Sequence, residues 1–218
     1  MNQTTSPPMP TTARTASIEQ LLEPKQERAL RTRSQILEAS AELFAQHGYL
    51  GTSITDVARS VGMTKGAVYF HFKDKEDMAI AVVETHYQRW ATLLDSVHGQ
   101  GLDPLATIHE LLDRAAHAFA EDAMVRAGTR LQAEQAQIKA ELPRPYLAWI
   151  EKLASNLIAS AQEAGQVRRD LEAAALARVI VSAFFGMQYV SDVLNSRDDL
   201  LTRWSEVRTV VLGALAPR

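Results

Sequence analysis

The residue types best suited to chemistry lie in one short stretch, 64–72, which reads Thr-Lys-Gly-Ala-Val-Tyr-Phe-His-Phe. Thr64 would place a hydroxyl and free backbone N–H groups at the start of a helix, where phosphate binds well. Lys65 offers a flexible cation for phosphate or for the major-groove edge of guanine. Gly66 would let the backbone approach another surface closely, and because glycine costs about 1 kcal/mol inside a helix, its presence there needs a reason. These three residues together indicate binding to nucleic acid.

More hydrogen-bond donors and cations follow in the same stretch and just after it. Tyr69 and His71 can donate hydrogen bonds to phosphate oxygens, and Lys73 and Lys75 extend a basic edge. The alternative is an ordinary corner between two helices, which needs only a glycine in the turn. The coincidence of basic side chains, a glycine in the second helix and a cluster of Tyr, Phe and His favours nucleic acid.

Two short helices are expected to position these side chains. Ser53 can cap a helix that begins at Ile54, and Asp56 stands three residues after Ser53, close to a capping box. Gly62 then predicts a tight turn, and Thr64 caps the second helix. This arrangement is a helix–turn–helix, a motif that places its second helix in the major groove of DNA.

The rest of the chain shows apolar residues at helical spacing and no alternating strand pattern. We therefore expect an all-α fold of about nine helices, over 26–48, 54–61, 64–70, 74–94, 104–119, 124–140, 145–164, 171–194 and 200–215. Residues 1–24 are rich in Pro, Thr and Ser and cannot bury enough apolar surface to offset the entropy of ordering them. We expect a flexible arm there, with contact to the minor groove of DNA as its functional alternative.

Composition and charge exclude several classes of protein. The 218-residue chain has no cysteine, so disulfides, iron–sulfur clusters and cysteine zinc sites are excluded. Its net charge is -3, but residues 25–75 carry +3 and residues 76–218 carry -5, which suggests two functions on one chain. The longest uncharged run, between Arg178 and Asp192, has 13 residues and is too short for a bilayer. We expect no membrane contact and a cytoplasmic location.

Sequence motifs for catalysis are incomplete. His109-Glu110 begins the zinc-protease pattern His-Glu-x-x-His, but Asp113 occupies its fifth position. The chain has neither a Gly-rich phosphate loop nor a Gly-x-Ser-x-Gly elbow. We therefore expect no metal, no cofactor and no enzymatic activity. The alternative is a helical enzyme or small-molecule binding module that carries a vestigial helix–turn–helix.

The second half of the chain places polar-tipped side chains on apolar helix faces. Buried Tyr, Gln and Trp side chains need hydrogen-bond partners, and a ligand with oxygen acceptors can supply them. Gly128 would leave space beside them. The alternative is that these are ordinary core or interface residues. The side chains concerned are Tyr87, Trp90, Gln132, Tyr146 and Trp149.

The helix expected over 171–194 is apolar nearly all round between Val179 and Val193. Such a helix must be buried on most sides. In a chain of this length, we expect one of those sides to be buried against a second copy.

A family resemblance is carried by the helix–turn–helix and the helix before it. Residues 56–72, followed by Lys75-Glu76, are similar to the DNA-binding domain of the TetR family of repressors. Residues 31–33 and 36–44, ending in His47-Gly48-Tyr49, fit the first helix of that domain. The resemblance implies a DNA-binding domain over 25–75, a ligand-binding and dimerisation domain over 76–218, and a homodimer formed through the last two helices.

A two-fold dimer of this kind would present two recognition helices about 34 Å apart to a pseudo-palindromic operator. The expected contacts with double-stranded DNA are Lys25, Arg28, Arg31, Thr52, Ser53, Thr64, Lys65, Gly66, Tyr69, His71 and Lys75.

Other motifs are similar to the γ-butyrolactone autoregulator receptors of antibiotic-producing actinomycetes. They lie at 64–67, 69–72, 125–128, 130–131, 142–143, 145–146, 149, 184–188 and 190–191. Residues 78–90 resemble the branch of these receptors associated with furan-type signals. The resemblance adds Phe184 to the expected ligand contacts and supports Trp149, since these receptors carry a ligand-contacting Trp in a Pro-Tyr-x-x-Trp context.

The resemblance implies a repressor that a small signal releases from DNA, the signal being of γ-butyrolactone, butenolide or furan type. Its targets would be genes for antibiotic or signal biosynthesis. The alternative within the same class is a multidrug-sensing repressor of an efflux gene, with a promiscuous pocket.

Overall fold

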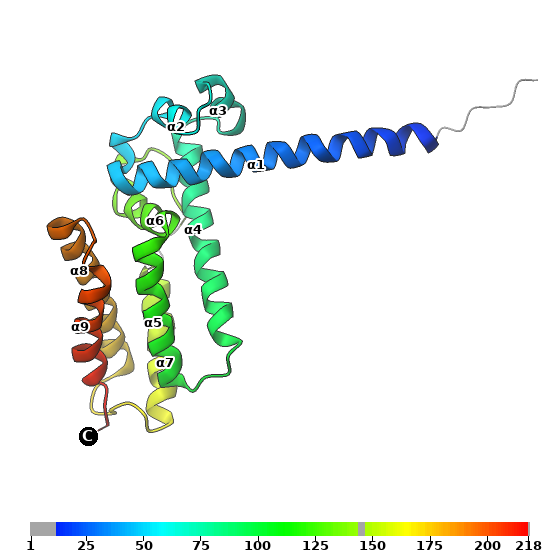
Figure 1. Ribbon diagram of the computed structural model, residues 1–218. Helices are drawn as coiled ribbons and strands as arrows, with labels where there is room; N and C mark the ends of the chain where they lie inside the picture. Colours follow the sequence, from blue (N-terminus) through cyan, green and yellow to red (C-terminus); the bar gives the residue numbers. More distant parts are fainter. Residues whose placement is uncertain (1–11, 144–146, 218) are drawn as a thin grey trace, which may run out of the picture.

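The structure, a computed structural model, describes residues 12–143 and 147–217, and within these the side chains of 26–143 and 150–217. The described residues form nine α-helices and one short 3-10 helix, without strands, which confirms the predicted all-α fold (Figure 1). The helices are α1 (Thr12–Gly51), α2 (Ile54–Ser60), α3 (Lys65–His71), α4 (Lys75–His98), α5 (Pro104–Glu121), α6 (Ala123–Ala133), η1 (Gln135–Gln137), α7 (Leu147–Glu163), α8 (Ala173–Asn195) and α9 (Leu200–Gly213).

The helices are arranged around α4, which connects the two ends of the molecule. Figure 1 shows α2 and α3 together at one end, above the C-terminal part of α1. Helices α4, α5 and α7 run lengthwise through the body, and α8 and α9 lie side by side along one edge of it. Helix α6 lies where α1 meets the body.

Side-chain caps fix the starts of the short helices as the sequence predicts. The Ser53 hydroxyl accepts the backbone N–H of Asp56 while the Asp56 carboxylate accepts the backbone N–H of Ser53, which completes a capping box. Thr64 caps α3 by accepting the backbone N–H of Ala67 at 3.2 Å. Between them, Gly62 takes a φ of +66°, a conformation that suits glycine.

The start of α1 corrects the prediction of a flexible arm over residues 1–24. The helix begins at Thr12, and its N-terminal part extends away from the body (Figure 1). The prediction considered only burial, whereas residues 13–23 contain Ala, Arg, Glu, Gln and Leu, which are strong helix formers. These residues can extend a helix that the folded domain has already nucleated. Residues 1–11 lie outside the described residues.

The end of α6 also differs from the prediction, which placed it at residue 140. The helix ends at Ala133 because the side chain of Gln135 binds the backbone that follows. Its amide nitrogen donates to the carbonyl of Ala140 at 3.1 Å, and its oxygen accepts the N–H of Leu142 at 3.0 Å. Such side-chain bonds offer the backbone an alternative to helix.

The apolar core does not divide at residue 75. One cluster of buried side chains joins α1, α2 and α3 to the first half of α4 and to α6, so the two predicted domains share a core. A second cluster packs α5, α7, α8 and α9 together. Representative members of the first cluster are Phe44, Val57, Phe72, Val82 and Leu131.

Candidate functional site

Helix α3 presents one face to solvent and anchors the other in the core. Val68 and Phe72 are fully buried. Tyr69 is 46% exposed, and Thr64, Lys65 and Gly66 are also exposed. A side chain at Gly66 would meet only the Thr64 hydroxyl, 3.9 Å from the added carbon. The packing of the chain therefore gives no reason for a glycine at this position.

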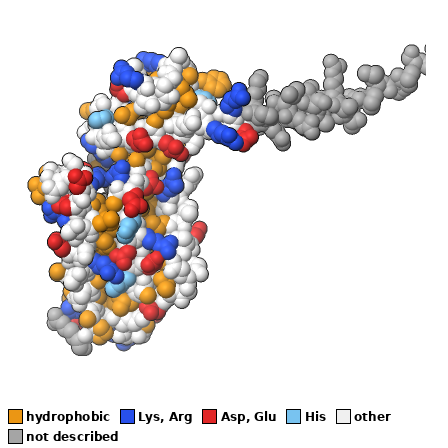
Figure 2. Space-filling view, viewed as in Figure 1, with side chains coloured by type: hydrophobic (Ala, Val, Ile, Leu, Met, Phe, Trp, Pro, Cys, Tyr) orange, Lys and Arg blue, Asp and Glu red, His pale blue; other side chains and the backbone are white. Residues whose placement is uncertain are grey.

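Basic side chains surround this face of α3. The Lys65 ammonium lies 5.7 Å from the centre of the Tyr69 ring, and Lys73 is exposed just beyond the helix. Figure 2 shows Lys and Arg side chains at the end of the molecule that α2 and α3 form. His71 is half-buried, and its ring packs edge-on against Phe70. Ser53 is exposed at the start of α2.

Two of the predicted DNA contacts have side chains that bind backbone carbonyls within the chain. Thr52 is buried, and its hydroxyl donates to the carbonyl of Gly48 at 2.9 Å. The ammonium of Lys75 donates to the carbonyls of Tyr49 and Thr52 at 2.9 and 3.1 Å, and it lies 4.0 Å from the centre of the Tyr49 ring. Burial lowers the pKa of Lys75. The Thr52 hydroxyl is thus held by a carbonyl four residues away, and the Lys75 ammonium by carbonyls 26 and 23 residues away.

The remaining predicted basic contacts lie on α1. Arg28 and Arg31 are exposed, and the guanidinium of Arg31 pairs with Glu27 one turn earlier. The side chain of Lys25 lies outside the description. All of these positions precede the part of α1 that packs beneath α2 and α3.

An apolar cavity of about 100 Å³ lies inside the body, between α4, α5, α7 and α8. Of the predicted ligand contacts, Trp90 and Phe184 line it. Among the described lining residues, the indole N–H of Trp90 is the one polar side-chain group. The other described lining residues are Leu93, Leu94, Ile108, Leu111, Leu112, Ala115, Phe119, Ile150, Leu153, Ala154, Leu157, Ile158, Ile180, Val181 and Phe185.

Tyr87 and Gln132 do not line that cavity but lie in contact with each other. The amide nitrogen of Gln132 on α6 donates to the Tyr87 hydroxyl on α4 at 2.8 Å, and both residues are half-buried. Burial raises the pKa of Tyr87. Tyr146 and the side chain of Trp149 lie outside the described residues.

His86 is a buried residue that the sequence did not single out. The indole N–H of Trp90 donates to Nε2 of His86 at 3.1 Å, so that nitrogen carries no proton. Burial lowers the pKa of His86 to about 4. A side chain at Gly128 would come within 2.4 Å of the His86 ring, so the space beside Gly128 holds His86 rather than a ligand. A glycine in the middle of α6 indicated in the sequence that another group lies close to this helix, but it did not identify that group as His86.

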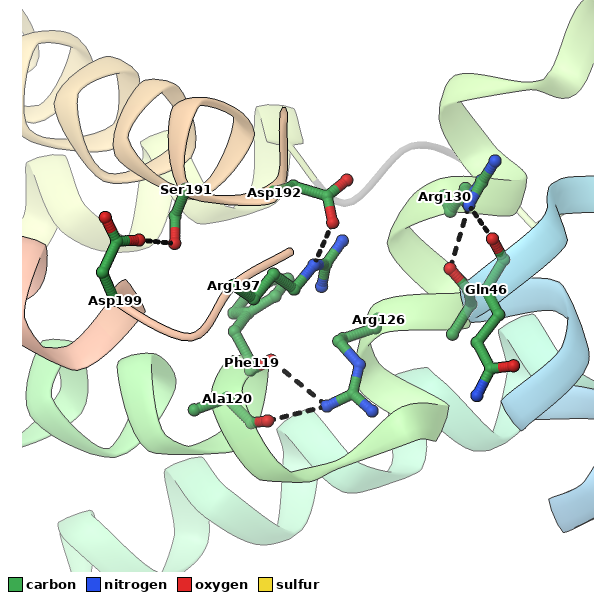
Figure 3. Close-up of polar contacts among 10 residues, drawn as sticks. Gln46, Phe119, Ala120, Arg126, Arg130, Ser191, Asp192, Arg197 and Asp199 are labelled. Carbon is green, nitrogen blue, oxygen red and sulfur yellow. Dashed lines mark hydrogen bonds and ion pairs between the residues drawn. The ribbon is translucent and has the colours of Figure 1, made fainter. Parts of the chain in front are cut away.

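Helix α6 binds the end of α1 through an ion pair, Arg130–Glu134, that the sequence analysis did not single out. The Arg130 guanidinium donates to the carbonyls of Ala45 and Gln46 at 2.9 and 3.1 Å (Figure 3). It also contacts the Glu134 carboxylate at 3.0 Å. The other oxygen of Glu134 accepts the backbone N–H of Tyr49 at 2.6 Å. One ion pair therefore holds both sides of the bend in α1.

The bend itself is at Gly48, where φ is +71° and ψ is -177°. A side chain at Gly48 would come within 2.5 Å of the Glu134 carboxylate. Only glycine adopts this backbone conformation readily, and only glycine leaves room for the carboxylate. The prediction of a break at Gly48 is confirmed, and the structure adds the reason for it.

The turn between α8 and α9 lies beside the start of α6 (Figure 3). Arg197 takes a φ of +74° and contacts the Asp192 carboxylate at 2.6 Å. Arg126 donates to the carbonyl of Ala120 at 2.8 Å. Burial and, after it, the charge of Arg197 lower the pKa of Arg126. Figure 3 shows the two arginine side chains beside each other at this junction.

Helix α8 has one buried and one exposed apolar side. Ile180, Phe184 and Met187 are buried in the body. Val179 and Val193, 59% and 61% exposed, stand two heptads apart on the other side. Within the described chain, α8 is the one helix long and apolar enough to cross a membrane by length and composition, a test that core helices also pass. The side chain of Gln188 on α8 is buried, and its amide nitrogen Nε2 has no hydrogen-bond partner in the described part of the chain.

No group of three or more His, Asp or Glu side chains that could hold a metal ion occurs among residues 26–143 and 150–217. The candidate site therefore consists of the exposed face of α3, the cavity with the neighbouring Tyr87–Gln132 contact, and the α6–α1 junction between them.

Comparison with known proteins places both halves of the chain in one family. Residues 36–82 match the model of the bacterial regulatory proteins of the tetR family, and residues 106–217 match the tetracyclin repressor-like C-terminal domain. The chain is 32% identical over 192 residues to the A-factor receptor protein of Streptomyces griseus, covering 88% of this chain. It spans 66% of that receptor and less than half of the next curated relatives.

Two solved structures extend the likeness to the whole fold. One, from work on the molecular basis for control of antibiotic production by bacterial hormones, is 53% identical with a TM-score of 0.75, covering 85% of this chain and 98% of that one. The other is CprB of Streptomyces coelicolor in complex with its biological operator sequence, 27% identical with a TM-score of 0.77, covering 87% and 90%. Since the two family models together match most of its length, this chain belongs to the TetR family of bacterial transcriptional regulators.

Proposed function

We propose that the chain is a ligand-responsive transcriptional repressor that binds a pseudo-palindromic operator as a homodimer and is released from it by a small autoregulator signal. Similarity to the A-factor receptor protein and to a structure concerned with hormone control of antibiotic production supports this proposal. The regulated genes would be those for antibiotic or signal biosynthesis. Such a repressor works in the cytoplasm.

The operator would be held by the exposed face of α3. Lys65 and Tyr69 supply a cation and a hydroxyl, and Gly66 lets the backbone of α3 approach the bases. Thr64, at the start of the helix, adds a hydroxyl. Phosphate contacts would come from Ser53, His71, Arg28 and Arg31, with Lys25 as a further candidate. Thr52 and Lys75 are left out, because their polar atoms are bound within the chain.

The dimer would form through the exposed side of α8 together with α9. Val179, Gly186 and Val193 recur every seven residues along α8, and Val210 on α9 is also exposed. A seam with this spacing suits the packing of a four-helix bundle. The pairing would place two copies of α3 about 34 Å apart, one helical turn of DNA.

The signal would occupy the apolar cavity, with Trp90 and Phe184 against its carbon skeleton. Its polar part would reach Tyr87 and Gln132 on α4 and α6, and Tyr146 and Trp149 are further candidate contacts. An apolar cavity beside a few hydrogen-bonding groups suits a small, neutral molecule with oxygen acceptors. A γ-butyrolactone, butenolide or furan signal fits this description.

The observation that carries the proposal is that α6 binds both α4, which lines the cavity, and the bend in α1. Gln132 holds α4 beside the cavity, and Arg130 and Glu134, less than one turn away on either side, hold the bend in α1 beneath α2 and α3. A ligand that takes over the Tyr87 or Gln132 hydrogen bond would shift α6 and with it α1. The signal must bind the DNA-incompetent state better, and a hundredfold preference corresponds to about 2.7 kcal/mol of coupling.

A multidrug-sensing repressor is the second candidate within the family. Its usual ligands include hydrophobic cations, which a buried carboxylate would stabilise. The described lining of the cavity has no Asp or Glu, which favours a neutral signal. A single signal class that acts at nanomolar concentration, rather than many cations at micromolar concentration, would distinguish the two.

The test is a mobility-shift experiment with the purified full chain and DNA from its own upstream intergenic region, with and without extract of the producing culture. The proposal predicts a specific shift that the extract abolishes. A shift that the extract does not change would contradict release by an autoregulator signal. It would leave the proposal of an operator-binding repressor intact. If no shift appears at low salt, genome-wide selection of bound DNA must recover an operator, and failure of both would contradict the repressor.

A further inference from the structure

Phe70 is the most exposed large apolar side chain among the described residues, at 82%. It is the last residue but one of α3, and it stands between Val68 and Phe72, which are both fully buried. The helix is therefore well anchored, and Phe70 is not a core residue left uncovered by poor packing. Its ring contacts the His71 ring edge-on, with 5.2 Å between the ring centres, and the rest of its surface is open to a partner outside the chain.

The surroundings of Phe70 indicate what that partner is. Gly66 stands four residues earlier, on the same face of α3, and leaves open surface there. Side chains on a helix lean toward its N-terminus, so the ring of Phe70 extends toward the bare surface at Gly66. Lys65, next to Gly66 in the sequence, and Lys73, three residues after Phe70, are both exposed. An apolar ring on a helix with exposed cations before and after it complements a polyanion that carries an apolar group.

We propose that Phe70 contacts the 5-methyl group of a thymine in the major groove of the operator and so contributes to the choice of DNA sequence. This inference rests on the proposed function, in which α3 enters the major groove. Phe70 has no atom that can hydrogen-bond to a base edge or a phosphate. The thymine methyl is the apolar group that the major groove presents, and contact with it is a known way for a phenylalanine to read sequence.

The position of Phe70 separates it from the proposed dimer contact. Helix α3 lies at one end of the molecule, whereas α8 and α9 lie along an edge of the body (Figure 1). A second copy bound through α8 and α9 would leave Phe70 uncovered. Operator DNA is then the partner that can bury the ring.

The experiment measures the affinity of the full chain for its operator when each thymine is replaced in turn by deoxyuridine, which removes only the methyl group. The proteins compared are the wild type, Phe70→Ala, Phe70→Leu and the control Leu102→Ala. Leu102 is a partly exposed apolar residue between α4 and α5, at the opposite end of the body from α3. Thermal unfolding of each variant checks its fold, and 82% exposure predicts that Phe70→Ala leaves the melting temperature unchanged.

For the wild type, uracil at one thymine position should weaken binding about fourfold per half-site, and about fifteenfold when both half-sites are changed. Phe70→Ala should bind the thymine and uracil operators equally, Phe70→Leu should keep part of the difference, and Leu102→Ala should behave as the wild type. Wild-type affinity that is unchanged by uracil at every position would overturn the inference.

The inference would also be overturned if Phe70→Ala lost the same factor of affinity for the thymine and the uracil operators. The variant would then keep the wild-type difference between the two operators. That result would assign the ring to another contact, such as insertion between base steps in the minor groove. Failure of the wild type to bind any operator would instead overturn the proposed function, and this inference with it.

Discussion

The backbone N–H of Tyr49 donates to the carboxylate of Glu134 across 85 residues of sequence, at 2.6 Å. The same carboxylate pairs with Arg130, which binds the last carbonyls before the bend in α1. Helix α6 is thus joined to the bend in α1 by a charge-assisted hydrogen bond to the backbone. A contact of this kind has a defined geometry, and substitution of a single side chain removes it.

Glu134→Ala should loosen the junction between α6 and α1. The change leaves the N–H of Tyr49 and the guanidinium of Arg130 without their carboxylate, which costs about 1–3 kcal/mol in the free energy of unfolding. It should also reduce the effect of the signal on operator affinity, because α6 would no longer move α1. Urea unfolding and operator titration with and without signal measure the two effects. Exposed Glu141 provides the matched control, Glu141→Ala, and a normal signal response in Glu134→Ala would contradict the role of the junction.

Gly48→Ala should destabilise the protein more than an alanine at another glycine of positive φ. The backbone conformation costs about 1–3 kcal/mol for a residue with a side chain, and the added carbon would also displace the Glu134 carboxylate, which lies 2.5 Å away. Gly101 also has a positive φ, +63°, but nothing lies within 4 Å of a side chain there. The difference in unfolding free energy between Gly48→Ala and Gly101→Ala measures the clash together with the extra strain of the extended ψ at Gly48. Equal losses of unfolding free energy in the two variants would show that the Glu134 carboxylate can move away from residue 48 without destabilising the protein.

Gly66→Ala should change stability and DNA binding in opposite directions. Alanine is favoured over glycine inside a helix by about 1 kcal/mol, and the structure has open space at this position. The melting temperature should therefore rise slightly while operator affinity falls, because the added methyl group keeps the backbone of α3 from the bases. Thermal unfolding and a mobility shift measure the two. A variant that is more stable and binds the operator normally would remove Gly66 from the interface.

His86 should make stability depend on pH. Its pKa in the folded protein is about 4, below the ordinary value of 6.5, because burial disfavours the charged ring. The stabilisation is therefore fully present above about pH 6.5 and is lost as the pH falls toward 4, since the unfolded chain binds the proton first. A shift of this size corresponds to about 3 kcal/mol. Urea unfolding between pH 4 and pH 7.5 should show a steeper loss for the wild type than for His86→Gln, and equal slopes would contradict the assignment.

The parts of the fold that the sequence predicts are those set by neighbouring residues. The caps at Ser53 and Thr64 and the turn at Gly62 depend on groups three or four positions apart, and each is found as expected. The N-terminal start of α1 was missed because burial was used to decide a question of local helix propensity. The early end of α6 was missed because a single glutamine side chain, Gln135, competes for the backbone.

The parts of the candidate site that the sequence does not predict depend on partners far away in the chain. Lys75 looks like a surface cation until Tyr49 and Thr52 are placed beside it. Gly128 looks like space for a ligand until His86 fills it. No local pattern marks Glu134 as the partner of Tyr49, since the spacing of 85 residues is fixed only by the packing of α6 on α1.

In the proposed mechanism, signal and operator bind to the same protein at each other's expense, through α6. Calorimetry of the purified signal with the free protein and with the operator-bound protein tests it most directly, because coupling is reciprocal. The operator-bound protein should bind the signal about a hundredfold more weakly, equivalent to about 2.7 kcal/mol. Equal affinity in the two states would contradict it, however tightly the signal binds.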